Sequence, residues 1–159
     1  MKKSGKTRFG YKKHVVTNEE GLILGILTTL ANVNEISNLE EVFNIADLPE
    51  GIYLNADKGY ASEKNEQILK NKKIKSRILH RVRKGKLLTE KQKLRNKLIG
   101  KTRFKVERTF GSIKRWFNST HTRYKGIAKT HTQNIIEAIA HNLYRAPGIV
   151  ASNSIKMTK

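Results

Sequence analysis

The sequence predicts an α/β fold with a sheet of mixed direction. Residues 8–17 and 22–33 are rich in β-branched and apolar side chains and are separated by a four-residue turn, which indicates a hairpin. Further along the chain, short apolar runs alternate with segments of helical periodicity, which is typical of strands joined by helices. A hairpin followed by such alternation is expected to give both antiparallel and parallel strand neighbours.

The first elements follow from local pattern. The turn of the hairpin is Asn18-Glu19-Glu20-Gly21, and the run after it is apolar almost throughout, as in a strand buried on both faces. Residues 35–46 then predict an amphipathic helix that ends before Pro49, because the residue preceding a proline disfavours helix. The apolar positions of that helix are Ile36, Leu39, Val42, Phe43 and Ala46.

The middle of the chain predicts two short strands around a helix. The stretch "IYLNADKGY" (residues 52–60) indicates a strand that runs into a turn at Lys58-Gly59. Ser62 is suited to cap a helix over about residues 62–72, and "IKSRIL" (residues 74–79) indicates the next strand. Residues 80–89 are predicted to form a basic loop.

Two helices are predicted in the last part of the chain. Thr89 and Gln92 fit a capping box that opens a helix over residues 89–117, interrupted near Gly100. A final helix over residues 129–145 is expected to end at Pro147-Gly148. Residues 1–150 are therefore assigned to one domain, and residues 151–159 to a loose polar tail.

The charge of the chain predicts a polyanionic partner. Lys and Arg number 33 against 13 acidic residues, which gives a net charge of +20 among 159 residues. The sequence has no apolar run near the ~20 residues that span a bilayer, which favours nucleic acid over a membrane. Cysteine is absent, so disulfides and thiolate zinc sites are excluded. We expect a cytoplasmic protein, or a nucleoid-associated one in a cell without a nucleus.

Acidic residues are scarce, which draws attention to those that remain. The two aspartates are Asp47, at a helix end where a turn-forming role is expected, and Asp57. Asp57 closes the apolar strand and precedes Lys58-Gly59. Ligands bind at strand ends in open α/β sheets, so Asp57 is either a turn residue or a functional carboxylate.

Glu107 is a carboxylate in a basic helix. At about 100° per residue, Arg103 and Lys114 share its face. Glu107 either pairs with Arg103 on the surface or, with Asp57, holds a hard cation such as Mg²⁺. The apolar stripe beside it consists of Val106, Phe110, Ile113 and Phe117.

Four stretches together resemble the C-terminal part of bacterial DDE-type insertion-sequence transposases, which have a ribonuclease H-like catalytic fold. The resemblance implies that Asp57 and Glu107 are catalytic and bind Mg²⁺ or Mn²⁺, and that the substrate is DNA, both transposon ends and target. It makes Lys58, Arg103, Lys114 and Arg115 candidate DNA contacts. Trp116 could stack on a base, but its apolar neighbours favour packing in the core. The stretches are "FGYKKHVVTNEEGLILGILTTLANVNE", "YLNADKGYASEKN", "RFKVERTFGSIKRWF" and "HTQNIIEAIAHNLYR".

Two departures from the family pattern bear on activity. Gly100 stands where the family often has a Tyr, three residues before Arg103. The first catalytic Asp of the family belongs to a strand that precedes this hairpin, so the predicted sheet lacks its first strand. We therefore expect a truncated or split-gene transposase that is inactive alone and needs an upstream half or a homo-oligomer. The alternatives are a non-catalytic basic nucleic-acid-binding protein and a regulatory fragment that binds full-length transposase.

Overall fold

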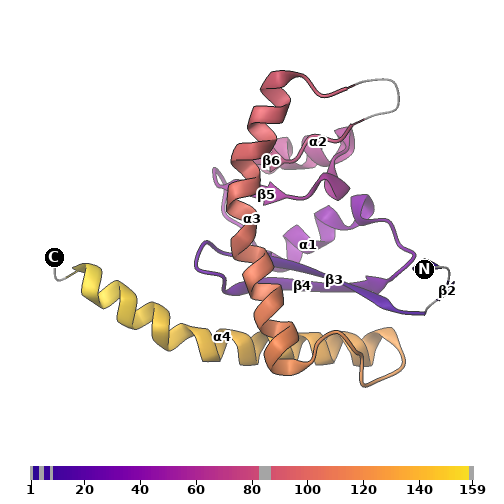
Figure 1. Cartoon of the computed structure of the whole chain (residues 1–159), viewed down its shortest axis with the longest axis vertical. Helices are drawn as coiled ribbons and strands as arrows, with labels where there is room; N and C mark the ends of the chain where they lie inside the picture. The colour runs from indigo at the N-terminus through magenta and orange to yellow at the C-terminus, as the bar shows by residue number, and fades with distance from the viewer. Residues whose placement is uncertain (1, 4–5, 8, 83–86, 158–159) are drawn as a thin grey trace. The chain divides into compact units, whose positions relative to one another are not determined.

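A computed structural model describes residues 2–3, 6–7, 9–82 and 87–157 (Figure 1). The chain divides into two compact units. The hairpin unit comprises Met1–Val33 and Lys105–Lys159, and the parallel-strand unit comprises Asn34–Phe104. The long helix α3 (Glu90–Phe117) contributes residues to both units. No helix in the described ranges is long and apolar enough to cross a membrane.

The predicted hairpin is confirmed. Strands β3 (Tyr11–Thr17) and β4 (Ile23–Leu30) pair antiparallel, with an irregularity in register between Val16 and Thr17. The Asn18 carboxamide closes the turn by accepting hydrogen bonds from the backbone N–H groups of Glu20 and Leu22 at 3.0 and 2.9 Å. Two further short strands, β1 (Lys2–Lys3) and β2 (Lys6–Thr7), form a separate antiparallel pair.

Helix α4 (Ile127–Met157) packs against the hairpin, and Figure 1 shows the two side by side. The carboxamide of Asn142 accepts a hydrogen bond from the backbone N–H of Ile23 and donates one to its carbonyl oxygen, each at 2.8 Å. Ile113 of α3 completes the apolar core of this unit, whose other buried members are Ile23, Ile26 and Ala138.

The predicted end of the last helix is wrong. Helix α4 continues through Pro147 as far as Met157, so residues 151–157 of the expected polar tail are helical. Proline removes one hydrogen bond to the carbonyl four residues earlier, here that of Leu143. Pro147 and Leu143 are both exposed, so water can solvate that carbonyl and the helix tolerates the proline.

The parallel-strand unit follows the predicted element order. The 3₁₀ helix η1 (Glu35–Asn38) leads directly into α1 (Leu39–Ala46), which ends at Asp47 in a left-handed conformation, as a turn residue should. Strand β5 (Tyr53–Ala56), 3₁₀ helix η2 (Lys58–Tyr60), helix α2 (Glu63–Asn71) and strand β6 (Lys75–Ile78) follow. Ser62 caps α2 by accepting a hydrogen bond from the N–H of Asn65, as predicted.

Strands β5 and β6 pair in parallel, with α2 as the connection between them. Their side chains pack on a mainly apolar core whose buried members are Leu39, Phe43, Leu69, Ile74 and Ile78. The α/β class is thus confirmed. Among the described strands, β3 pairs with β4 in one unit and β5 with β6 in the other, so the single mixed sheet stays a prediction.

The start of helix α3 is fixed by the predicted capping box. The N–H of Gln92 donates to the Thr89 hydroxyl, and the Gln92 side chain accepts from the N–H of Thr89. The interruption expected near Gly100 is absent, because α3 is continuous to Phe117. A glycine inside a helix costs only ~1 kcal/mol relative to alanine, and the preceding Ile99 is buried. Residues 83–86 of the predicted basic loop lie outside the described residues.

Candidate functional site

Asp57 lies where β5 ends, in the position that the sequence predicted. Its backbone is extended, and its carboxylate caps η2 by accepting a hydrogen bond from the N–H of Lys58 at 2.7 Å. The turn role and the functional role are therefore compatible, because the cap fixes the direction of the side chain at the strand end. Asp57 is half-buried, and Lys58 beside it is exposed.

A second carboxylate lies in the surroundings of Asp57. Burial, together with the negative charges of Glu35 and Asp57, raises the pKa of Tyr60 from 10.0 to about 12. A Cβ atom added to Gly59 would collide with the Glu35 carboxylate, so the Glu35 side chain lies directly against this turn. Sequence reasoning missed Glu35, since it begins a helix and its proximity to the η2 turn depends on the fold.

Glu107 lies on the exposed side of α3, as predicted from the helical pattern. The stripe beside it packs inward: Ile113 is 1% exposed, and Phe117 contacts the same core. Thr109, two residues after Glu107, is also buried, and its hydroxyl donates a hydrogen bond to the carbonyl of Gly21. These contacts fix the rotation of this part of α3, so the Glu107 carboxylate is held on the solvent side.

Asp57 and Glu107 fall in different units, so their convergence on one metal ion stays a prediction. Within the described ranges, no three His, Cys, Asp or Glu side chains are grouped so that they could hold a metal ion. The donor chemistry nevertheless fits a hard cation, because Mg²⁺ is commonly held by one or two carboxylates together with substrate phosphates and water.

The candidate DNA-contacting residues include three exposed cations. Lys58 follows Asp57 in η2, while Lys114 and Arg115 occupy the last turn of α3. The backbone of Arg103 belongs to α3, but its side chain lies outside the described residues, as does the proposed pair with Glu107. Within each unit, basic side chains thus flank the carboxylate that the sequence singled out.

The expectation that Trp116 packs in the core is wrong. Its side chain is 57% exposed, and its ring lies 5.5 Å from that of Tyr144 and 5.5 Å from the guanidinium of Arg115. The apolar stripe turns Phe117 inward, and Trp116, one residue earlier, is rotated about 100° away from it. Trp116 is therefore an exposed aromatic residue on a basic surface.

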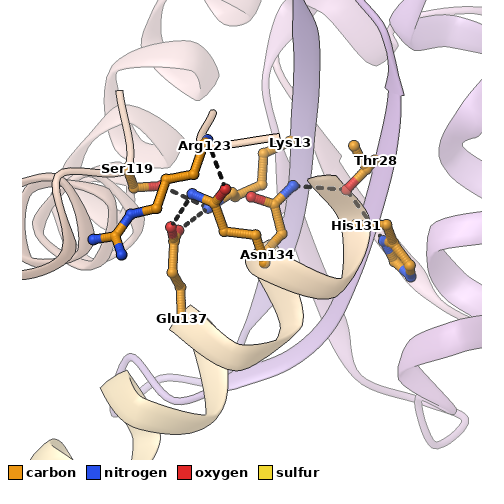
Figure 2. Close-up of polar contacts among 8 residues, drawn as sticks. Lys13, Thr28, Ser119, Arg123, His131, Asn134 and Glu137 are labelled. Carbon is orange, nitrogen blue, oxygen red and sulfur yellow. Dashed lines mark hydrogen bonds and ion pairs between the residues drawn. The ribbon is translucent and has the colours of Figure 1, made fainter. Parts of the chain in front are cut away.

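A buried polar cluster joins the hairpin to α4 and was not foreseen from the sequence. Figure 2 shows the Lys13 ammonium between Glu137 and Ser119, at 2.7 Å from each. Asn134 donates to the Thr28 hydroxyl at 2.7 Å, and His131 lies 3.1 Å from the same hydroxyl. The cluster links β3, β4, the connector 118–126 and α4 by hydrogen bonds.

The electrostatics of this cluster are set by Glu137, whose side chain is almost completely buried. Burial by itself would raise the pKa of Glu137, but hydrogen bonds from Lys13, Ser119 and Gln133 and the charge of Lys13 lower it. Glu137 is thus held as a carboxylate. In the part of the chain that the structure describes, every buried side-chain nitrogen and oxygen has a hydrogen-bond partner.

Comparison of the sequence with known proteins identifies the family of the chain. Residues 1–143 match the family model described as "Transposase DDE domain". The chain is 36% identical over 146 residues to the transposase for insertion sequence element IS1106 of Neisseria meningitidis serogroup B. That match covers 92% of this chain but 50% of the relative, so the chain spans about half of the relative's length. No solved structure matches the chain significantly. By its sequence, the chain belongs to the family of transposases with a DDE domain.

Proposed function

We propose that this chain is part of a transposase that cleaves and joins DNA at the ends of an insertion sequence, within a ribonuclease H-like catalytic domain. The observation that carries the proposal is the position of Asp57. Its carboxylate is fixed by a backbone hydrogen bond at the end of a strand, directly before an exposed lysine. This position suits a residue that must hold a metal ion beside a phosphate.

Asp57 and Glu107 are the residues that would hold Mg²⁺ or Mn²⁺, because both are carboxylates beside basic surface. A divalent cation, when bound, supplies activation of the attacking oxygen and stabilisation of the leaving oxygen in phosphoryl transfer. The rotation of α3, fixed by Ile113 and Thr109, keeps Glu107 available at the surface. The hydrogen bond from the N–H of Lys58 likewise holds the Asp57 carboxylate in place at the strand end.

Lys58, Arg103, Lys114 and Arg115 would bind the DNA backbone. Contacts of lysine and arginine with phosphates supply most of the affinity and fix the position of the duplex without reading its sequence. Such contacts would bring the scissile phosphate to the carboxylates and offset the repulsion between two anions. Because binding releases counterions, it is expected to weaken steeply as salt rises.

A third carboxylate would come from sequence outside this chain. The relative is about twice as long as the matched region, and the DDE family uses two aspartates and one glutamate. The missing aspartate would be supplied by an upstream transposase half or by another subunit of a homo-oligomer. Cleavage by this chain is therefore expected only when that part is present.

The proposal is tested by nicking of plasmid DNA that carries insertion-sequence ends, with the chain supplied with the upstream half of the meningococcal relative. We expect nicking that requires Mg²⁺ or Mn²⁺ and that falls to background in Asp57→Asn and Glu107→Gln. Asp47→Asn and Glu90→Gln are matched controls, because one is the other aspartate and the other lies on the same helix. An equal loss of nicking in the two controls would contradict the assignment of Asp57 and Glu107 as metal-binding residues. Unchanged nicking in Asp57→Asn and Glu107→Gln would contradict it too.

A non-catalytic nucleic-acid-binding protein is the second candidate, and the net charge of +20 favours it. It predicts salt-dependent DNA binding that is unchanged or stronger in Asp57→Asn and Glu107→Gln, since each removes negative charge. It also predicts no metal-dependent nicking under any pairing with an upstream half. A regulatory role would instead require that the chain binds the full-length transposase, which co-purification measures directly.

A further inference from the structure

Glu35 is a second carboxylate beside the strand end that carries Asp57, and both residues belong to the parallel-strand unit. Glu35 begins the 3₁₀ helix η1, and its side chain is half-buried. The side chain of Asn34 caps this helix by accepting a hydrogen bond from the N–H of Ile36 at 3.2 Å. The cap fixes the first turn of η1 and therefore the direction in which the Glu35 side chain leaves the backbone.

Asn65 joins η1 to the turn that follows Asp57. Its side chain is 1% exposed, and its amide nitrogen donates hydrogen bonds to the carbonyl of Ile36 at 3.0 Å and to that of Tyr60 at 2.8 Å. The backbone N–H of Asn65 donates to the Ser62 hydroxyl, so the start of α2 is part of the same arrangement. One buried amide therefore holds the residue after Glu35 next to the end of η2.

The Glu35 carboxylate lies against the middle of η2. A methyl group at Gly59 would occupy the space that one of its carboxylate oxygens fills. Besides the effect of burial, the charges of Glu35 and Asp57 both raise the pKa of Tyr60, so both carboxylates lie near its hydroxyl. Two negative charges are therefore held around this one turn of the chain.

A second negative charge at this position favours the binding of a cation. The chain carries a net charge of +20, and the exposed Lys58 follows Asp57 directly, so the surrounding field repels a free cation. A nearby carboxylate opposes that repulsion, since the attraction between opposite charges grows as their separation falls. Because Glu35 is half-buried, salt screens its charge less than that of an exposed side chain.

We propose that Glu35 is a positioning residue for Asp57: held against Gly59, its charge strengthens the binding of a divalent cation at the Asp57 carboxylate. This role is additional to the two aspartates and one glutamate that the DDE family uses. The inference rests on the proposed function in one respect, namely that Asp57 binds Mg²⁺ or Mn²⁺. It does not depend on Glu107 or on the missing carboxylate, because Glu35, Asp57 and the turn between them belong to one unit.

The experiment measures the binding of Mn²⁺ to the full chain, with the free ion counted by electron paramagnetic resonance. The binding that is lost in Asp57→Asn defines the site. We expect Glu35→Gln, which keeps the shape of the side chain and removes its charge, to weaken Mn²⁺ binding at that site about threefold to tenfold. Glu35→Asp retains the charge and should stay within about twofold of the unsubstituted chain. Glu41→Gln is the matched control, because it removes the same charge at an exposed position of α1.

Gly59→Ala displaces the carboxylate without altering Glu35 itself. Gly59 does not have a positive φ, so alanine fits its backbone, and the added methyl group meets the flexible end of the Glu35 side chain. We expect this variant to weaken Mn²⁺ binding by a factor close to that of Glu35→Gln. The double variant should bind Mn²⁺ no more weakly than either single variant, since both changes remove the same interaction. Circular dichroism checks that each variant is folded.

Nicking and DNA binding separate the charge of Glu35 from damage to the turn. With the upstream half present, Glu35→Gln should raise the Mn²⁺ concentration that gives half-maximal nicking and leave the rate at saturating Mn²⁺ unchanged. Binding of duplex DNA should be unchanged or tighter, because the variant removes negative charge. A loss of both the maximal rate and the DNA affinity would assign Glu35 a purely structural role and overturn the inference.

The failure of the inference differs from the failure of the proposed function. Unchanged Mn²⁺ affinity in Glu35→Gln, with affinity lost in Asp57→Asn, would overturn the inference and leave the proposed function intact. An equal loss of affinity in Glu41→Gln would do the same. Weaker Mn²⁺ binding in Glu35→Gln, without nicking in the presence of the upstream half, supports the inference while contradicting the proposed catalysis. Unchanged affinity in Asp57→Asn would overturn both.

Discussion

The two units of the chain are stabilised by different kinds of interior. The parallel-strand unit buries apolar side chains from α1, α2 and β6, and among its described residues the buried polar ones are Asn38 and Asn65. The hairpin unit has a smaller apolar cluster and places an ion pair and several hydrogen-bonded side chains between its hairpin and α4. In the part of this unit that the structure describes, the buried polar residues are His14, Thr28, Thr29, Thr109, Thr130, Asn134, Glu137 and His141.

This difference has a physical consequence for the two units. Apolar burial is non-directional and tolerates small shifts, whereas a buried polar network is favourable only when every member is paired. The hairpin unit should therefore respond sharply to the loss of single polar groups. The parallel-strand unit should respond mainly to loss of volume.

The largest effect is expected at the buried ion pair. Glu137→Leu would leave the Lys13 ammonium without its carboxylate in a mainly buried site, which costs about 3–5 kcal/mol of unfolding free energy. The double variant Lys13→Met with Glu137→Leu should recover much of that loss, because no unpaired charge remains. Urea denaturation followed by Trp116 fluorescence and by circular dichroism measures both.

The matched control is the exposed pair of Lys73 and Glu50 in the parallel-strand unit, at 2.9 Å. Glu50→Gln should change the unfolding free energy by less than ~1 kcal/mol, because exposed pairs are solvated. A similar cost for Glu50→Gln and Glu137→Leu would remove the distinction between the two units.

Loss of buried side-chain volume should lower the unfolding free energy most in the parallel-strand unit. Leu69 is 0% exposed at the centre of its core, and Leu69→Ala is expected to cost about 3 kcal/mol through lost burial and the cavity left behind. Leu98→Ala, at an exposed position on α3, is the control and should cost well under ~1 kcal/mol. The free energy of unfolding in urea decides between these outcomes.

The pH dependence of stability should differ in sign between the units. The pKa of Glu137 is lowered from 4.5, so its contribution is present above that pH and is lost as the pH falls through the lower folded-state value. The pKa of Tyr60 is raised from 10.0 to about 12, so its contribution is present below pH 10.0 and is lost as the pH rises toward 12. Acid should weaken the hairpin unit and alkali the parallel-strand unit.

Tyr60→Phe tests the alkaline side. Between pH 10.0 and pH 12 the unsubstituted chain should lose unfolding free energy on the order of 2 kcal/mol, a figure that allows for partial exposure of Tyr60. The Tyr60→Phe variant should not show this loss. Glu137→Gln should likewise reduce the dependence of the unfolding free energy on pH in acid. Denaturation midpoints across a pH series measure both slopes, and an unaltered alkaline slope in Tyr60→Phe would contradict the assignment.

The smallest expected effect lies at the start of α3. Thr89→Ala removes the hydroxyl that accepts from the N–H of Gln92, which should cost about 1 kcal/mol. Thr89→Ser keeps a capping hydroxyl and should be close to neutral. Helix content and the urea midpoint together check this prediction.

The sequence was most informative where a local pattern decides the structure. The hairpin, the caps at Ser62 and Thr89 and the strand-end position of Asp57 each depend on a few neighbouring residues, and all were predicted. The inward stripe that leaves Glu107 exposed was predictable for the same reason, because helical period alone sets it.

The features that were missed depend on tertiary contacts. Glu137 and His14 are polar, so a reading by hydrophobic pattern assigns them to the surface, and only their partners across the fold explain their burial. Trp116 is apolar and adjoins the stripe, yet it lies outside the core. The role of Glu35 beside η2 depends on a close approach at Gly59 that no sequence spacing reveals.

Asn142 has a consequence for association between molecules. Its carboxamide bonds both the N–H and the carbonyl of Ile23, as the backbone of an adjacent strand would. A strand edge with unpaired backbone groups invites pairing with another chain and aggregation. At Ile23 the side chain of Asn142 already occupies those groups, so an incoming strand must first displace it. One amide on α4 therefore protects this point of the hairpin from intermolecular β-pairing.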